Sequence, residues 1–92
     1  TGVQTCALPI LGSDQPGPGG TAIHEMGGAR MGHDPRTSVL NAWSQAHDAP
    51  NLFVTDGAQM SSSACQNPSL TYMALTARAC DAAVRMLREG KI

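Results

Sequence analysis

Three short stretches of this 92-residue sequence carry side chains that could do chemistry. His24 lies in HEMGGARMG, and imidazole is the side chain that most readily takes up or releases a proton near neutral pH. Asp56 and Gly57 follow an apolar run, where the end of a buried strand could present them to a ligand. Asn67 stands directly before Pro68 at the start of a segment with helical spacing, so its amide would lie at a helix N-terminus.

Each stretch also has a simpler structural interpretation. A single histidine is more often a structural residue than a catalyst. An Asp-Gly pair after a strand is usually a turn, and an asparagine before a helix caps it whether or not anything binds there. Taken one at a time, none of the three stretches identifies a function.

Taken in order, the three stretches match a known pattern. The blocks HEMG-x-ARMG-x-DP-x-x-SVLN, NLFVTDG and QNPSLTYMALTARA resemble the C-terminal part of the glucose–methanol–choline (GMC) FAD-dependent oxidoreductases, and look closest to the bacterial sugar and polyol dehydrogenases. The resemblance runs from Thr21 to about Leu87. It implies an α/β fold, or α+β for this fragment in isolation, in which this region completes an FAD-binding Rossmann-like domain. It also implies an enzyme that acts on a CH–OH group.

The resemblance also implies roles for single residues. His24 matches the family's active-site base, which takes the proton from the substrate hydroxyl while hydride leaves the neighbouring carbon for flavin N5. Asn67 matches the partner that hydrogen-bonds the same substrate oxygen. The positive end of the helix that follows would favour the anionic, reduced flavin. The residues implied to bind FAD are Asp56, Gly57, Asn67, Pro68 and Ser69.

Two departures from the family pattern matter. Gly28 stands where the family often has threonine, which removes a hydroxyl but no catalytic role. The dinucleotide fingerprint G-x-G-x-x-G is missing, because the PGPGG of residues 16–20 neither follows a strand nor begins a helix. We therefore expect most of the FAD site and of the substrate pocket to lie in a preceding part of a longer protein, and the free chain to be inactive.

The most strongly patterned element is a helix predicted from about Pro68 to Glu89. Asn67 is its predicted N-cap, Pro68 suits its first turn, and Gly90 suits its C-terminus. Apolar residues at three- and four-residue spacing define one face of this helix. That face comprises Leu70, Met73, Ala74, Ala77, Cys80, Val84 and Leu87.

The rest of the chain carries weaker patterns. The apolar run near residues 51–55 predicts one buried strand of a parallel sheet, and residues 22–32 predict an irregular segment around one short strand. Residues 11–21 are rich in glycine and proline and predict a connector. Residues 22–92 are then the GMC C-terminal region.

Thr1–Ile10 (TGVQTCALPI) has neither helical nor strand spacing, and it resembles a translated sequencing-library adapter. We expect it to be a scar that does not belong to the protein; a native N-terminal strand is the alternative. Without Cys6, the two remaining cysteines, Cys65 and Cys80, are too few for a disulfide framework or a four-ligand zinc site.

Composition excludes several classes of function. A net charge of −1 and an isoelectric point near 6.2 give no basic footprint for nucleic acid. No apolar run approaches the roughly 20 residues of a membrane-spanning helix. The spacings of His24, His33 and His47 match no compact metal motif, so no metal site is predicted.

Other assignments stay open from the sequence. The substrate could be a sugar, a polyol or another alcohol, the electron acceptor could be oxygen, a quinone or a cytochrome, and the location could be the bacterial cytoplasm or periplasm. A small non-enzymatic module whose helix docks on a partner is the alternative function. An apolar helix face has the same spacing whether it packs on its own core or on another protein.

Overall fold

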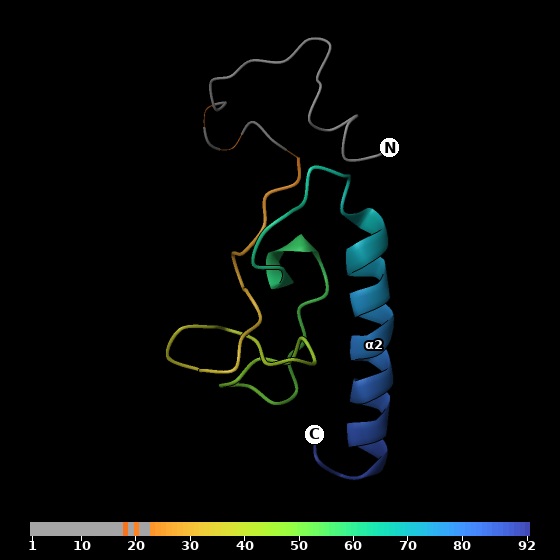
Figure 1. Ribbon diagram of the computed structural model, residues 1–92. Coiled ribbons are helices and arrows are strands. Elements are labelled where there is room, and N and C mark those ends of the chain that lie inside the picture. Colours follow the sequence, from red (N-terminus) through yellow and green to blue (C-terminus); the bar gives the residue numbers. More distant parts are fainter. Residues whose placement is uncertain (1–17, 19, 21–22) are drawn as a thin grey trace.

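The computed structural model describes residue 18, residue 20 and residues 23–92. The predictions for Thr1–Ile10 and for most of the 11–21 connector therefore lie outside the described residues. Within that part of the chain, the elements are a short 3₁₀ helix, η1 (Gly57–Gln59), and one α-helix, α2 (Ser69–Arg88). Figure 1 shows the loops of residues 23–60 lying along one side of α2.

The long helix forms where the sequence predicts it. Its observed bounds, Ser69–Arg88, lie one residue inside the predicted ones at each end. The C-terminus is closed by Gly90, whose φ of 66° is a conformation that glycine adopts without steric cost. Gly90 N–H donates to the Leu87 carbonyl at 3.1 Å and Lys91 N–H to the Met86 carbonyl at 2.9 Å, which is the Schellman pattern.

The N-terminus of α2 differs from the prediction. Pro68, not Asn67, occupies the N-cap position, and no side chain in the described part of the chain caps the first turn of this helix with a hydrogen bond. The reason is that the Asn67 side chain is bonded elsewhere, to His24. The N–H groups of the first turn therefore have no side-chain acceptor within residues 23–92.

The apolar face that spacing predicts for α2 is not the side that packs against the loops. Of its residues, Ala79 and Ala82 are buried, and they lie on the opposite side from the predicted face. Four large members of the predicted face are exposed, namely Leu70, Met73, Val84 and Leu87. Periodicity identified an apolar face correctly but not the side on which the loops pack. Alanines let the loops approach the helix closely, and this selects the other side.

The predicted strand near residues 51–55 does not form among the described residues. Phe53 makes only an isolated antiparallel bridge with Gln45, and Val54 N–H donates to the Ser44 carbonyl at 3.0 Å. The short strand predicted within 22–32 is likewise reduced to one parallel bridge between Met31 and Leu40. A strand takes its hydrogen bonds from neighbouring strands, and the described residues supply no sheet for these segments to join. The α/β class is therefore not confirmed.

The loops contain a small core of their own. Leu40 and Ala46 are its buried apolar residues, and Ser44 and Gln59 are its buried polar ones. The Ser44 hydroxyl donates to Gln59 Oε1, which satisfies that oxygen, whereas Gln59 Nε2 is buried and has no hydrogen-bond partner among the described residues. Since unsatisfied buried polar atoms are costly, the one bond that this amide does make matters for stability.

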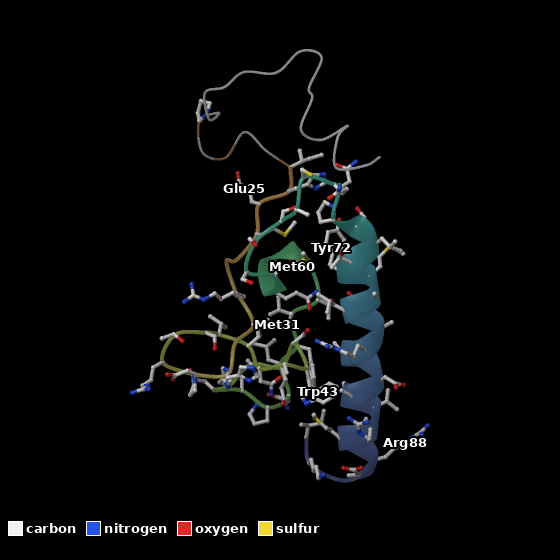
Figure 2. All side chains as sticks on the ribbon, in the orientation of Figure 1. Glu25, Met31, Trp43, Met60, Tyr72 and Arg88 are labelled. Carbon is white, nitrogen blue, oxygen red and sulfur yellow. The ribbon has the colours of Figure 1, made fainter. Side chains whose placement is uncertain are left out.

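A tight turn carries Trp43 against α2. The Asn41 side chain accepts from Trp43 N–H at 2.9 Å, and Ser44 has a positive φ of 60°. The guanidinium groups of Arg78 and Arg85 each lie 5.7 Å from the centre of the Trp43 ring, within the range of cation–π attraction. Figure 2 shows Trp43 between the loops and the lower half of α2, so the turn is attached to the helix by two arginines of α2.

Candidate functional site

The structure brings together the two residues predicted to carry the chemistry. His24 Nε2 lies 3.1 Å from Asn67 Oδ1, although the two residues are 43 positions apart in the chain. His24 is half-buried and Asn67 is exposed, so the pair is open to a ligand from one side. This contact explains why Asn67 does not cap α2.

The chemistry of the pair depends on which atom carries hydrogen. An amide oxygen can only accept, so in the observed arrangement the His24 Nε2 atom donates to Asn67. Rotating the Asn67 amide by half a turn would instead place Nδ2 against His24 as a donor. His24 Nε2 would then be an acceptor, which is the state that a base requires.

The loops bring His24 to a hollow that is also lined by Asp56 and Gly57, the second stretch that the sequence singles out. The hollow has a volume of about 360 Å³. Asp56 and Gly57 come from the start of η1, and Tyr72 comes from the first turn of α2. The residues that line it are Ile23, His24, Glu25, Met26, Asp56, Gly57, Ala58 and Tyr72. Of the predicted site residues, His24, Asp56 and Gly57 therefore share one concave surface.

Asp56 and Gly57 also have local structural roles. Asp56 is the N-cap of η1, and its side chain accepts from Ala58 N–H at 2.9 Å. A Cβ atom on Gly57 would lie 2.8 Å from the Met26 sulfur, closer than real Cβ contacts come. A side chain at position 57 would therefore displace the flexible end of Met26, which lies in the segment containing His24.

Two backbone hydrogen bonds fix that segment. Ala29 N–H donates to the Ala58 carbonyl at 3.0 Å, and Met31 N–H donates to the Gln59 carbonyl at 2.8 Å. They hold residues 29–31 beside η1, a few residues after His24. The position of His24 thus depends on the loop core through the backbone.

The start of α2 supplies the remaining predicted residues. Pro68 is buried at the N-cap, and the Ser69 hydroxyl lies 3.0 Å from the Tyr72 hydroxyl. The uncapped first turn offers backbone N–H donors and the positive end of the helix dipole, which suit an electron-rich or anionic group. These features fit one edge of a flavin. The sequence did not single out Tyr72 as a site residue, because its position within the predicted helix, three residues after Ser69, carries no separate signal.

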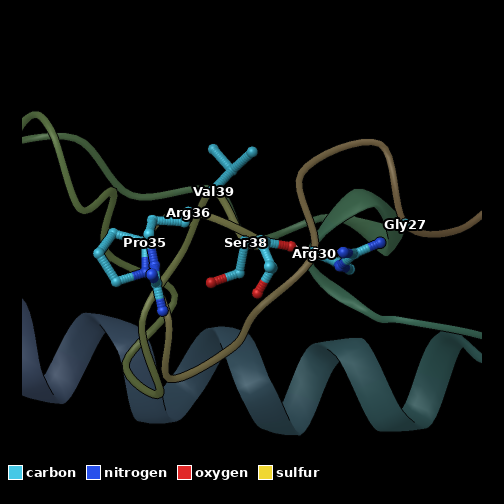
Figure 3. Close-up of a pocket in the computed structure, with 7 residues that line it drawn as sticks. Gly27, Arg30, Pro35, Arg36, Ser38 and Val39 are labelled. Carbon is cyan, nitrogen blue, oxygen red and sulfur yellow. Dashed lines mark hydrogen bonds between the residues drawn. The ribbon is translucent and has the colours of Figure 1, made fainter.

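A second hollow, of about 520 Å³, holds none of the predicted site residues (Figure 3). It is lined by Arg30 and Arg36, but neither guanidinium is free. Arg30 donates to the Thr37 carbonyl, and Arg36 forms an ion pair with Asp34 at 2.8 Å. The Arg36 hydrogen bonds lower the pKa of the Asp34 carboxyl, and the same bonds raise the pKa of the Arg36 guanidinium.

The other histidines lie outside the site. His33 is exposed, and His47 is half-buried, with Nε2 3.2 Å from both the Ser38 hydroxyl and the Gly32 carbonyl. The Ser38 hydroxyl donates to the Asp34 carbonyl, so it is engaged with the backbone. Among residues 18, 20 and 23–92, no group of three His, Cys, Asp or Glu residues could hold a metal ion.

Comparison with known proteins identifies the class. The sequence profile of the GMC oxidoreductase C-terminal domain matches residues 15–76, which is more than half of the chain. The chain therefore belongs to the GMC oxidoreductase family. The matched region contains His24, Asp56, Gly57 and Asn67.

Individual relatives agree with this family. The chain is 48% identical over 67 residues to the fructose dehydrogenase large subunit of Gluconobacter japonicus, which covers 73% of the chain and 12% of that protein. It is 48% identical over 58 residues to the 2-methyl-1,2-propanediol dehydrogenase of Mycolicibacterium austroafricanum, covering 63% of the chain and 10% of that protein. A cholesterol oxidase of Mycobacterium tuberculosis is 39% identical over 56 residues, covering 61% of the chain and 10% of that protein. The chain thus spans about a tenth of the length of these relatives.

Among the described residues, no helix is both long and apolar enough to cross a membrane.

Proposed function

We propose that this chain is the catalytic C-terminal region of an FAD-dependent oxidoreductase that acts on a CH–OH donor, a sugar, a polyol or another alcohol. The observation that carries the proposal is the contact between His24 Nε2 and Asn67 Oδ1. It joins the residues that match the family's base and its partner, at the uncapped start of α2. The names of the relatives support this substrate class, since they include a fructose and a propanediol dehydrogenase.

In the proposed reaction, the substrate hydroxyl enters between His24 and Asn67 and replaces their direct contact with two hydrogen bonds. His24 Nε2 takes the hydroxyl proton, and the Asn67 amide donates to the substrate oxygen, which orients it and stabilises its developing negative charge. FAD, when bound, supplies the acceptor for the hydride that leaves the substrate carbon. The substrate thereby becomes a carbonyl compound.

The chain's proposed contribution to holding FAD is one edge of the site. Pro68 and Ser69 present the backbone donors of the first turn of α2, and Asp56 and Gly57 line the hollow beside His24. The electron acceptor that reoxidises the enzyme is proposed to be a quinone or a cytochrome.

The test uses a chimera, in which residues 23–92 replace the corresponding segment of the Gluconobacter fructose dehydrogenase large subunit. Bound FAD is measured by its visible absorbance, and its bleaching is followed after anaerobic mixing with fructose. We expect His24→Ala to slow bleaching by at least about 10²-fold while the FAD content is unchanged. His33→Ala, an exposed histidine outside the hollow, is the matched control and should bleach at the rate of the parent chimera. Unchanged bleaching in the His24 variant would refute the assignment.

A second candidate function is a non-enzymatic module whose helix docks on a partner. The observation that favours it is the row of exposed apolar side chains on α2. The same chimera distinguishes the two functions. If it binds FAD but fructose never bleaches it, even with His24 intact, the docking module is the better interpretation.

A further inference from the structure

Tyr72 is the side chain through which α2 takes part in the hollow that holds His24. Of the described residues that line this hollow, all the others precede α2, and Tyr72 is the one that the helix supplies. The side chain is half-buried, and Figure 2 shows it near the start of α2 on the side of the loops. The proposed proton transfer to His24 does not use the Tyr72 phenol, so its presence in the hollow calls for a separate explanation.

The Tyr72 hydroxyl is paired with the hydroxyl of Ser69. The two oxygens lie 3.0 Å apart, and either hydroxyl can be the donor in this contact. Each hydroxyl has one proton, so the contact uses one of the two protons and leaves the other outside it. Ser69 is exposed and Tyr72 is half-buried, so the pair joins the wall of the hollow to the open first turn of α2. The pair can therefore offer a single O–H donor to a ligand there.

Thr76, one turn after Tyr72, holds another wall of the hollow against α2. Its hydroxyl oxygen lies 2.7 Å from the Tyr72 carbonyl oxygen and 2.7 Å from the carbonyl oxygen of Thr55, which directly precedes Asp56. One hydroxyl proton is shared between these two carbonyls. The bond to Thr55 fixes the segment that carries Asp56 and Gly57 beside the turn that carries Tyr72. The Tyr72 ring thus has a defined place in the hollow.

The charges around the hollow make a donor on the helix side important. Glu25 and Asp56 both line the hollow, and their carboxylates disfavour further negative charge within it. Backbone N–H groups engage each carboxylate, Gly20 N–H donating to Glu25 Oε1 at 3.1 Å and Ala58 N–H to Asp56 Oδ1 at 2.9 Å. A hydrogen-bond donor from α2 would offset the repulsion that a ligand gaining negative charge meets from these two side chains.

We propose that Tyr72 is a positioning residue for the Ser69 hydroxyl, and that the pair presents one O–H donor to the electron-rich edge of FAD. This inference deepens the proposed function and rests on it, since Ser69 belongs there to the part of the chain that holds the cofactor. A hydroxyl that is already held in place need not reorient when negative charge develops beside it, so it stabilises that charge more strongly than a freely rotating one. The edge gains negative charge on reduction, so the pair favours the reduced cofactor.

The experiment measures the reduction potential of FAD in the fructose dehydrogenase chimera by equilibration with a reference dye. Tyr72→Phe keeps the ring that lines the hollow and removes its hydroxyl. We expect the affinity for reduced FAD, relative to oxidised FAD, to fall about tenfold, which lowers the potential by about 30 mV for a two-electron couple. Ser69→Ala should have the same effect. The double variant should show no more than either single one, because the two hydroxyls act as a unit.

Thr37→Val is the matched control. It also removes one hydroxyl with little change in shape, but Thr37 lines the other hollow and not the one that holds His24, so the potential should stay at the value of the parent chimera. The urea unfolding midpoint of each variant is measured in parallel. A hydroxyl with a purely structural role would change this midpoint and leave the potential unmoved. If the chimera does not accumulate, only residues 69–76 are exchanged into the relative.

Three outcomes would overturn the inference. The first is an unchanged potential in Tyr72→Phe. The second is a double variant in which the two single shifts add, since the hydroxyls would then act independently. The third is loss of FAD from the relative when only residues 69–76 are exchanged, which would make the pair incompatible with the cofactor.

The proposed function is read separately, from the bleaching of the His24→Ala chimera. A potential that falls in Tyr72→Phe, together with unchanged bleaching in His24→Ala, contradicts the proposed function alone. Bleaching that depends on His24, together with a potential that does not respond to Tyr72→Phe, contradicts the role of Tyr72 alone.

Discussion

The core of the loops and the site near the N-terminus of α2 are stabilised in different ways. In the core, Leu40, Ser44 and Gln59 are completely buried, and nearby Trp43 lies against two arginines of the helix. At the site, His24 and Asn67 meet through one hydrogen bond beside an open hollow. The first region holds the fold together, and the second leaves polar groups available to a ligand. We expect substitutions in the two regions to separate stability from activity.

The largest effect on stability is expected for Leu40→Ala. Leu40 is fully buried, and removing a buried leucine side chain costs about 2–5 kcal/mol through lost burial and the cavity left behind. The change is measured as the shift of the urea unfolding midpoint of the chain. Val39→Ala, at an exposed neighbour, is the control and should shift the midpoint much less. Equal shifts would show that the loops have no core of their own.

A smaller loss is expected for Ser44→Ala. The substitution leaves Gln59 Oε1 buried without its donor, in an amide whose Nε2 already lacks a partner, and should cost about 1–3 kcal/mol. The double variant Ser44→Ala with Gln59→Leu removes the unsatisfied amide as well. We expect it to recover part of the loss in the same unfolding experiment, and no recovery would mean that the amide finds another partner.

The contacts that attach Trp43 to α2 should contribute less to the free energy of unfolding than the Ser44–Gln59 hydrogen bond does. Arg78 lies over the ring and also donates to the Ala42 carbonyl at 2.6 Å, whereas Arg85 lies over the ring alone. Arg78→Ala should therefore cost about 1–2 kcal/mol and Arg85→Ala about 0.5–1 kcal/mol. Trp43 fluorescence during unfolding measures both. The reverse order would show that the carbonyl bond contributes nothing.

At the site, His24→Ala should change stability by less than about 0.5 kcal/mol, because the half-buried His24 is joined to the exposed Asn67 by one hydrogen bond. The same substitution is expected to slow flavin bleaching strongly in the chimera. If His24→Ala destabilised the chain as much as Leu40→Ala does, the two regions would not differ in their contribution to stability, and the comparison would be wrong.

The smallest effect concerns Asp34. Its hydrogen bonds with Arg36 lower the pKa of this carboxyl below its ordinary range. A lowered folded-state pKa contributes stability that is present above the unfolded-state value and is lost as the pH falls through the folded-state value. Because the pair is exposed, we expect a shifted carboxyl titration in NMR but little change in the acid unfolding midpoint. In the Arg36→Ala variant, the pKa of the Asp34 carboxyl should return toward its ordinary range.

Local residue patterns predicted the parts of the fold that depend on local physics. The bounds of α2 follow from helix-forming residues between Pro68 and Gly90, and the Schellman closure follows from the freedom of glycine at positive φ. The strand near residues 51–55 failed, because a strand needs partners that the described residues do not include. The order of the blocks likewise identified the GMC family, which the family profile confirms.

The candidate site also has features that the sequence predicted and features that it did not. Residue types and order singled out His24, Asp56, Gly57 and Asn67, and the structure brings His24 to Asn67. The involvement of Tyr72 in the hollow and the close approach of Gly57 to Met26 could not be predicted, since both depend on segments distant in the sequence.

The sequence by itself determined where α2 begins and ends, that it has an apolar face, and which family the chain belongs to, because each of these depends on residues close together or on their order. Only the tertiary structure decided that Ala79 and Ala82 face the loops while Leu70, Met73, Val84 and Leu87 face solvent. It also decided that Asn67 pairs with His24 rather than capping the helix. The physical reason is that an apolar pattern or an amide can satisfy more than one partner, and the choice is made by which groups the folded chain brings within reach.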